Sequence, residues 1–252
     1  MRTILAALLL GAGLTLPATA SAEPLDLSSM SESDRAAFGE QVRAYLLQHP
    51  EVLLEALEIL DQRRTATAAE ADKELIAANS ESLFNDGFSW VAGNPEGDVT
   101  VVEFLDYRCG YCKKAAPEVE ALLERDPNIR LVVKEFPILG PDSVIAGKLA
   151  LAALEMDRDR FGGLHNALME YRGELTEDAA YQLAEKAGYD VEALGQLATS
   201  FEIDDRLQEN YQLAQTLGLQ GTPAFVVGER IIRGYVPVET LETVVQEARE
   251  AN

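Results

Sequence analysis

The chain has 252 residues, of which 47% are hydrophobic and 25% are charged, a composition typical of folded globular proteins. Its 43 acidic residues outnumber the 21 basic ones and give a formal net charge of −22. Because nucleic acid and anionic membrane surfaces repel such a charge, we expect neither as a partner.

The first residues have the pattern of a secretory signal peptide. Arg2 gives a positive start, residues 4–16 are apolar but too few to span a bilayer comfortably, and residues 20–22 form a small-residue cleavage site. We therefore predict a signal peptide over residues 1–22 and a mature protein in the periplasm, an oxidising compartment. A retained membrane anchor is the alternative interpretation of the same stretch.

Residues 23–84 are predicted to form a helical region with more apolar residues than it can bury. Ser31 begins one helix, and Pro50 separates it from a second. Residues 31–60 carry many large apolar residues, whereas residues 61–74 hold nothing apolar larger than alanine. We expect residues 31–60 to assemble a homo-oligomer, a dimer or trimer, followed by a helical linker. Packing of these residues on their own chain is the alternative.

Residues 85–252 follow the order of a mixed α/β domain. Apolar runs predict strands at residues 99–105 and 129–136, with a helix from Cys109 between them. Residues from 143 to about 215 have helical periodicity throughout. A hairpin over residues 223–233 and a final helix from Pro237 complete the domain. This order predicts a mixed sheet with helices on both faces.

Both cysteines of the chain lie in one motif, Cys109-Gly110-Tyr111-Cys112, directly after the first of these strands. At the start of a helix, Cys109 meets free backbone N–H groups and the positive end of the helix dipole, which favour its thiolate. Cys112 lies one turn deeper and is expected to be more buried. We therefore predict a redox-active dithiol in which Cys109 attacks a disulfide and Cys112 resolves the mixed disulfide.

Other interpretations of the cysteine pair are weaker. A zinc site needs further ligands, and the only histidines, His49 and His165, are distant in sequence. A purely structural disulfide would close a very short loop and stabilise little. A non-enzymatic copper site on the two thiolates stays open, with His165 and Met169 one helical turn apart, although helix packing explains these two better. We predict no resident cofactor or metal.

Two charged residues interrupt the predicted strands, Glu103 in the first and Lys134 in the second. A lone carboxylate in a central strand is costly unless it is paired or functional. We expect a buried Glu103–Lys134 pair beneath the dithiol that passes protons to and from Cys112. A pair exposed on the surface is the alternative.

Together, the strand with Glu103, the Cys-Gly-Tyr-Cys motif, the helical stretch and Thr222-Pro223 before the hairpin resemble the DsbA-like family of the thioredoxin superfamily. This resemblance implies an α/β thioredoxin fold with a helical insertion at about residues 143–215. It further implies a thiol-disulfide oxidoreductase of exported proteins that contain cysteines. A membrane redox partner would reset the dithiol.

The resemblance also assigns roles to individual residues. Cys109, Cys112, Glu103 and Lys134 would be the catalytic set, with a Cys109–Cys112 disulfide in the oxidised state. Pro223 would be a cis-proline that faces the dithiol, and Thr222 would contact the substrate through its backbone. Gly110 and Tyr111, between the cysteines, would also lie at the substrate.

Residues 31–60, above all 45–53, are similar to the N-terminal segment of the suppressor of copper sensitivity protein C group, ScsC, a group of periplasmic disulfide isomerases and related proteins that oligomerise through this segment. Gly110-Tyr111 matches dimeric isomerases rather than the Pro-His of strong oxidants. We therefore expect a disulfide isomerase or reductase whose potential lies below the about −120 mV of a strongly oxidising dithiol. A DsbA-type oxidase and a copper-binding redox protein are the alternatives.

Overall fold

The computed structural model describes residues 30–251, so the predicted signal peptide lies outside the described residues. The chain divides into two compact units, and the boundary between Leu60 and Asp61 falls where large apolar residues give way to polar ones. Over residues 30–251, every helix is too short or too polar to cross a membrane.

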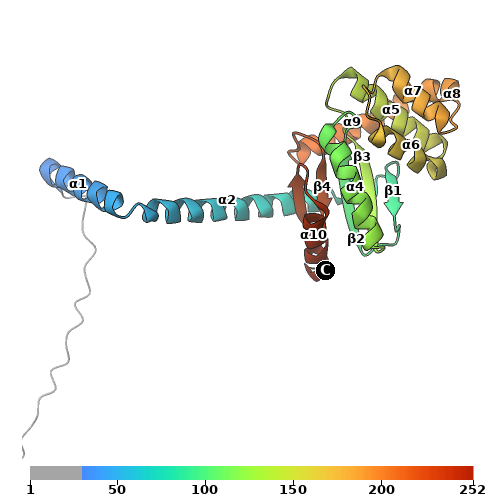
Figure 1. Ribbon diagram of the computed structural model, residues 1–252. Coiled ribbons are helices and arrows are strands. Elements are labelled where there is room, and N and C mark those ends of the chain that lie inside the picture. The colour runs from blue at the N-terminus through green and yellow to red at the C-terminus, as the bar shows by residue number, and fades with distance from the viewer. Residues whose placement is uncertain (1–29, 252) are drawn as a thin grey trace, which may run out of the picture. The chain divides into compact units, whose positions relative to one another are not determined.

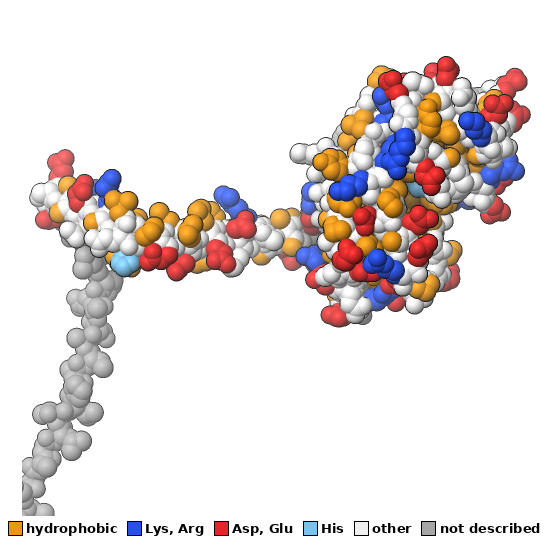
Figure 2. Space-filling view, viewed as in Figure 1, with side chains coloured by type: hydrophobic (Ala, Val, Ile, Leu, Met, Phe, Trp, Pro, Cys, Tyr) orange, Lys and Arg blue, Asp and Glu red, His pale blue; other side chains and the backbone are white. Residues whose placement is uncertain are grey.

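The first unit contains helix α1 (Glu32–Gln48) and the beginning of helix α2 (Glu51–Ala78). Ser31 is the N-cap of α1, and its hydroxyl accepts a hydrogen bond from the Asp34 N–H at 3.2 Å. The predicted break before Pro50 is confirmed. No residue of α1 is buried, and apolar side chains gather along both helices, as Figure 2 shows. The exposed large ones are Phe38, Val42, Tyr45, Leu47, Leu53, Leu54, Leu57, Ile59 and Leu60.

The second unit is built on a five-stranded mixed sheet in the order β1-β3-β2-β4-β5 (Figure 1). Only β2 and β3 are parallel, and the other neighbouring strands are antiparallel. The short β1 was not predicted, because four residues next to a glycine-rich loop give too brief a pattern. The strands are β1 (Trp90–Gly93), β2 (Val99–Leu105), β3 (Ile129–Glu135), β4 (Ala224–Val227) and β5 (Arg230–Arg233).

Helices cover both faces of this sheet, as predicted (Figure 1). On one face, Val101, Leu105 and Val133 pack with α4 and α10 and continue into the core of the helical insertion. On the other, Val102 and Phe104 pack with α3, α9 and the end of α2. The helices are α3 (Ser80–Phe84), α4 (Gly110–Arg125), α5 (Pro141–Met156), α6 (Arg158–Glu170), α7 (Glu177–Lys186), α8 (Val191–Ala198), α9 (Phe201–Thr216) and α10 (Val238–Ala251).

The last turns of α2 are attached to the second unit rather than free in solvent. Ile76 is buried in the core on the α9 face of the sheet. Asp72 accepts two hydrogen bonds from the Arg233 guanidinium, each 2.8 Å long. Lys73 forms an ion pair with Glu229 at 2.8 Å. Residues 72–76 are therefore part of the folded body of the second unit.

Candidate active site

The dithiol motif occupies the turn between β2 and α4. Cys109 is the N-cap of α4, and its sulfur accepts a hydrogen bond from the Cys112 N–H at 3.4 Å. This is the position that serine or aspartate usually fills at a helix start. The sulfur therefore lies where free backbone N–H groups and the helix dipole both attract negative charge.

A buried carboxylate holds this turn in place. Asp106 accepts hydrogen bonds from the N–H of Arg108 at 2.8 Å, of Ile138 at 2.9 Å and of Leu139 at 3.0 Å. The Cys109 N–H donates to the Asp106 carbonyl at 2.9 Å. Asp106 thus fixes the loops after β2 and β3 to each other and sets the position of the first cysteine.

The two cysteines have opposite acidities. The pKa of Cys109 is lowered to about 5, chiefly by a hydrogen bond with the Cys112 side chain, with contributions from Thr222 and the N–H groups of Cys112 and Tyr111. Cys112 is fully buried, and burial raises the pKa of its thiol far above the usual range. At neutral pH these pKa values make Cys109 a thiolate and Cys112 a thiol, the protonation states that the predicted roles of attacking and resolving sulfur require.

The loop before β4 faces this sulfur. The Thr222–Pro223 peptide bond is cis, as the resemblance implied. The Cys109 sulfur lies 3.2 Å from the Thr222 carbonyl oxygen, to which it donates a hydrogen bond when it is protonated. A hollow of about 530 Å³ borders Gly221 and Thr222 beside it. An extended peptide in this hollow would lie next to the reactive sulfur.

Gly110 and Tyr111 are exposed, and 65% of Tyr111 is accessible, so both residues are open to a bound substrate. Both cysteines are free thiols in this structure, which therefore describes the reduced form. The Cys109–Cys112 disulfide stays a prediction for the oxidised form.

The predicted pair between Glu103 and Lys134 is wrong, and so is the alternative of an exposed pair. Both residues are buried, but the strand register aligns Glu103 with Val133 and Phe104 with Lys134. Because side chains alternate along a strand, Glu103 and Lys134 lie on opposite faces of the sheet.

Lys134 instead pairs with a residue far away in sequence. Its ammonium lies 2.6 Å from the Asp86 carboxylate and 3.2 Å from the Ser89 hydroxyl. The Lys134 charge holds the pKa of Asp86 below its usual value against the effect of burial. Asp86 stands in Asn85-Asp86-Gly87, whose turn-like composition gave no sign of an ion pair.

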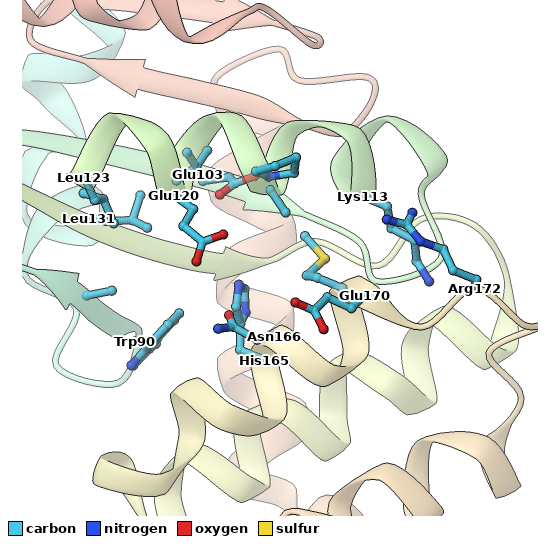
Figure 3. A pocket seen from close by; sticks show the side chains of 15 residues that line it. Trp90, Glu103, Lys113, Glu120, Leu123, Leu131, His165, Asn166, Glu170 and Arg172 are labelled. Carbon is cyan, nitrogen blue, oxygen red and sulfur yellow. The ribbon is translucent and has the colours of Figure 1, made fainter. Parts of the chain in front are cut away.

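Glu103 has no comparable partner. Its Oε1 atom is buried without a hydrogen bond among the described residues, and burial raises the pKa of its carboxyl to about 8. It lines a cavity of about 320 Å³ between α4 and α6, together with His165 and Trp90 (Figure 3). Glu103 is therefore mostly a neutral acid at pH 7, on the face of the sheet that α4 covers.

A second buried acid on the same face was missed. The Tyr107 hydroxyl donates to Glu135 Oε1 at 2.9 Å and lies 3.0 Å from His165 Nδ1. Burial raises the pKa of Glu135 well above its usual value and lowers that of His165 to about 4. Glu135 lies two positions after Val133, the residue of β3 that is aligned with Glu103. Because side chains alternate along a strand, Glu135 lies on the same face as Glu103, and this pattern could have identified it from the sequence.

The same contacts bear on the copper alternative. His165 is buried and its Nδ1 is occupied by Tyr107, so helix packing accounts for it. Within residues 30–251, no group of three or more His, Cys, Asp or Glu side chains is placed to hold a metal ion.

Family models match two parts of the chain. Residues 100–246 match the DSBA-like thioredoxin domain, and residues 34–66 match the copper resistance protein ScsC N-terminal domain. Among solved structures, a thioredoxin-like oxidoreductase from Silicibacter pomeroyi is 43% identical with a TM-score of 0.66, covering 68% of this chain and 98% of that one.

Two Salmonella structures are also similar. BcfH of Salmonella enterica Typhimurium is 32% identical with a TM-score of 0.72 and covers 86% of this chain and 96% of that one. A periplasmic thioredoxin-like protein from the same serovar is 34% identical with a TM-score of 0.63, covering 68% and 95%. These likenesses confirm the predicted thioredoxin fold with a helical insertion.

Curated relatives match over shorter parts. The Na(+)/H(+) antiporter NhaA 1 of Salinispora arenicola is 32% identical over 160 residues, which are 63% of this chain and 24% of the antiporter. The thiol:disulfide interchange protein DsbA of Bordetella pertussis is 30% identical over 138 residues, 53% of this chain and 65% of that protein. The chain thus spans less than two thirds of either relative.

Proposed function

This chain belongs to the DsbA-like thioredoxin domain family, and from this premise we propose that it is a thiol-disulfide oxidoreductase of the isomerase or reductase type. Its substrates are exported proteins with wrongly paired cysteines. The observation that carries the proposal is the asymmetry of the dithiol. Cys109 has a pKa of about 5 and lies 3.2 Å from the carbonyl of Thr222, a residue that lines a hollow, whereas Cys112 is buried as a thiol.

The chemistry follows from this asymmetry. The Cys109 thiolate attacks one sulfur of a substrate disulfide, a mixed disulfide forms, and the other substrate sulfur leaves as a thiolate. A substrate thiolate then attacks the mixed disulfide, which rearranges the substrate and frees Cys109. Alternatively, Cys112 loses its proton and attacks Cys109, which releases a reduced substrate and leaves a Cys109–Cys112 disulfide.

Glu103 fits the role of a proton acceptor and donor for Cys112. Attack by Cys112 requires loss of a proton from a buried thiol, and bulk water does not reach that sulfur. A carboxyl group with a pKa of about 8 takes up and releases protons near neutral pH. Lys134, on the other face of the sheet, has no part in this step.

The isomerase direction is supported by the first unit. Residues 34–66 match the ScsC N-terminal domain, and α1 and the start of α2 expose nine large apolar side chains. Water-exposed apolar surface of this kind favours association, and we propose that copies of the chain assemble through residues 31–60. Several dithiols held together would suit repeated attack on one misfolded substrate.

We also propose the compartment in which the protein acts and the role of each part of the chain. Residues 1–22 would be the signal peptide, residues 23–84 the oligomerisation region and linker, and residues 85–252 the redox domain in the periplasm. A membrane redox partner would keep the dithiol reduced. Measurement of the Cys109 redox state in cells tests this setting, since an isomerase requires the thiol form and an oxidase the disulfide form.

Reactivation of scrambled ribonuclease by the reduced mature protein tests the reaction. The expected result is recovery of ribonuclease activity, abolished by Cys109→Ser. Failure to reactivate, together with rapid oxidation of reduced ribonuclease by the disulfide form, would assign the chain to the DsbA-type oxidases instead.

Light scattering of a variant without residues 23–60 tests the assembly. The cut falls at the boundary between the units and keeps Asp72, Lys73 and Ile76, which contact the second unit. The expected result is a monomer, against an oligomer for the full mature chain. An unchanged subunit number in the shortened protein would contradict assembly through residues 31–60.

A further inference from the structure

A hollow of about 340 Å³ lies beside the attacking cysteine, and cations dominate its wall. It is lined by Arg108 and Gly110, the residues before and after Cys109, and by Lys113, Arg172 and Glu174. Three cations thus face one carboxylate, in a chain whose formal net charge is −22. This local reversal of charge requires an explanation.

The three cations differ in how they are compensated. Arg108 lies 3.2 Å from Asp142 and 3.8 Å from Glu174, so carboxylates already neutralise it. The Lys113 ammonium donates to the Tyr171 backbone carbonyl, which carries no net charge. Across residues 30–251, neither Lys113 nor Arg172 has a carboxylate within ion-pair distance.

Lys113 and Arg172 are also close enough to oppose each other. Figure 3 shows both side chains together at one end of the neighbouring cavity. The pKa of Lys113 is lowered by burial and by the Arg172 charge. The Asp106 charge opposes this effect, but that carboxylate already accepts hydrogen bonds from three backbone N–H groups. Lys113, in the first turn of α4 where the helix dipole is positive, and Arg172, from the segment after α6, therefore form a site that an anion would stabilise.

We propose that Lys113 and Arg172 form a carboxylate-binding subsite that favours disulfides whose attacked cysteine has an aspartate or glutamate neighbour. This inference rests on the proposed thiol-disulfide exchange at Cys109 and names a preferred substrate class for it. Arg172 is exposed and Lys113 partly buried, so a guanidinium and an ammonium both reach bound substrate. Bidentate binding by arginine would fix the carboxylate's orientation.

The geometry favours an acidic residue of a protein substrate as the source of this carboxylate. Consecutive residues of an extended chain are about 3.8 Å apart, so the side chain next to an attacked cysteine falls within reach of the hollow. The hollow adjoins Gly110 and Arg108, directly on either side of the reactive sulfur in sequence. A small disulfide with its own carboxylates, such as oxidised glutathione, offers the same chemistry and is distinguished by the test.

The test compares two peptide disulfides that differ only in a Glu or Gln beside the cysteine. The rate at which each peptide is reduced is measured for the full mature protein and for the variants Lys113→Gln and Arg172→Gln. Lys114→Gln is the matched control, because Lys114 is the next residue of α4, is exposed, and places its ammonium 4.0 Å over the Tyr235 ring. The readout is the ratio of the two rates, since removing a cation also changes the reactivity of Cys109 toward both peptides.

We expect the native protein to reduce the Glu peptide about three to ten times faster than the Gln peptide. The ratio should approach one in Lys113→Gln and Arg172→Gln, persist in Lys114→Gln, and decrease as salt screens the charges. Equal rates in the native protein, or an unchanged ratio in both subsite variants, would overturn the subsite.

Two further outcomes separate the possibilities. If the native protein reduces neither peptide, thiol-disulfide exchange itself is refuted and the subsite with it. If the reduction of oxidised glutathione depends on Lys113 and Arg172 while the peptide ratio does not, the assignment to protein substrates is overturned in favour of a small disulfide. Because Arg172 is exposed, we expect Arg172→Gln to fold as the native chain does, which keeps the test decisive.

Discussion

Each face of the sheet buries ionisable strand residues, and the environments of Lys134 on one face and Glu103 on the other are opposite. On the face covered by α9, Lys134 is fully buried and forms an ion pair with Asp86 at 2.6 Å. On the face covered by α4, Glu103 is buried with an unpartnered oxygen and a pKa raised to about 8. A buried charge that keeps its partner is held ionised and depends on that partner, whereas a buried acid without a partner is neutral and free to exchange protons.

Removing the Lys134 ammonium should produce the largest loss of stability. Lys134→Met leaves Asp86 nearly buried without its counter-ion, which we expect to lower the free energy of unfolding by about 3–5 kcal/mol. Urea denaturation measures this loss. Adding Asp86→Asn to the variant should restore part of it, because the orphaned charge is then gone as well.

The same variant tests whether the two faces of the sheet act independently. The pH at which Cys109 ionises should not change in Lys134→Met, because the sheet lies between that ammonium and the dithiol. A loss of stability below about 1 kcal/mol, or a displaced ionisation of Cys109, would contradict the division into a structural and a chemical face.

Glu103→Gln should change how stability depends on pH. The pKa of Glu103 is raised in the folded state, so the unfolded chain ionises first as pH rises. Native stability therefore decreases from the ordinary pKa of 4.5 until about pH 8, by up to about 5 kcal/mol. The variant lacks this loss and should gain stability relative to the native protein across that interval.

Unfolding free energies of both proteins at pH 5 and pH 8 measure this gain. The difference between the two proteins isolates Glu103, because His165, whose pKa is lowered to about 4, contributes a loss of stability toward acid pH in both. A constant difference from pH 5 to pH 8 would show that Glu103 is ionised in the folded state.

A smaller effect is expected at the buried network on the α4 face. Tyr107→Phe removes the hydroxyl between Glu135 and His165 and should cost about 1–3 kcal/mol, because two buried groups lose a partner. Exchange activity at Cys109 should remain. Stability equal to the native value would mean that water satisfies both groups once the hydroxyl is absent.

The dithiol and the sheet around it were predictable from sequence because their signals are local. Cys109 and Cys112 follow an apolar strand and begin a helix, and both were placed correctly relative to the helix start. The helices of the insertion follow periodic patterns, so they were found as well. The four-residue β1 was too short to leave a pattern.

The partners of buried charges were not predictable, because they depend on strand register and on distant residues. In the register of β2 and β3, Lys134 is aligned with Phe104 rather than with Glu103, so the two charged side chains lie on opposite faces. The partner of Lys134, Asp86, precedes it by almost fifty residues in a stretch with turn-like composition. The nearness of Lys113 to Arg172 likewise arises only when α4 and the segment after α6 come together.

Cys109 is a thiolate at neutral pH, because a hydrogen bond with the Cys112 side chain and the free N–H groups at the start of α4 lower the pKa of its thiol. The rate of iodoacetamide alkylation of the reduced native protein, measured from pH 3 to pH 10, tests this claim directly, since Cys112 is fully buried and protected. The structure predicts a rate that rises with a midpoint near pH 5. A midpoint near the ordinary cysteine value of 9.0 would contradict the claim and remove the basis of the proposed reaction.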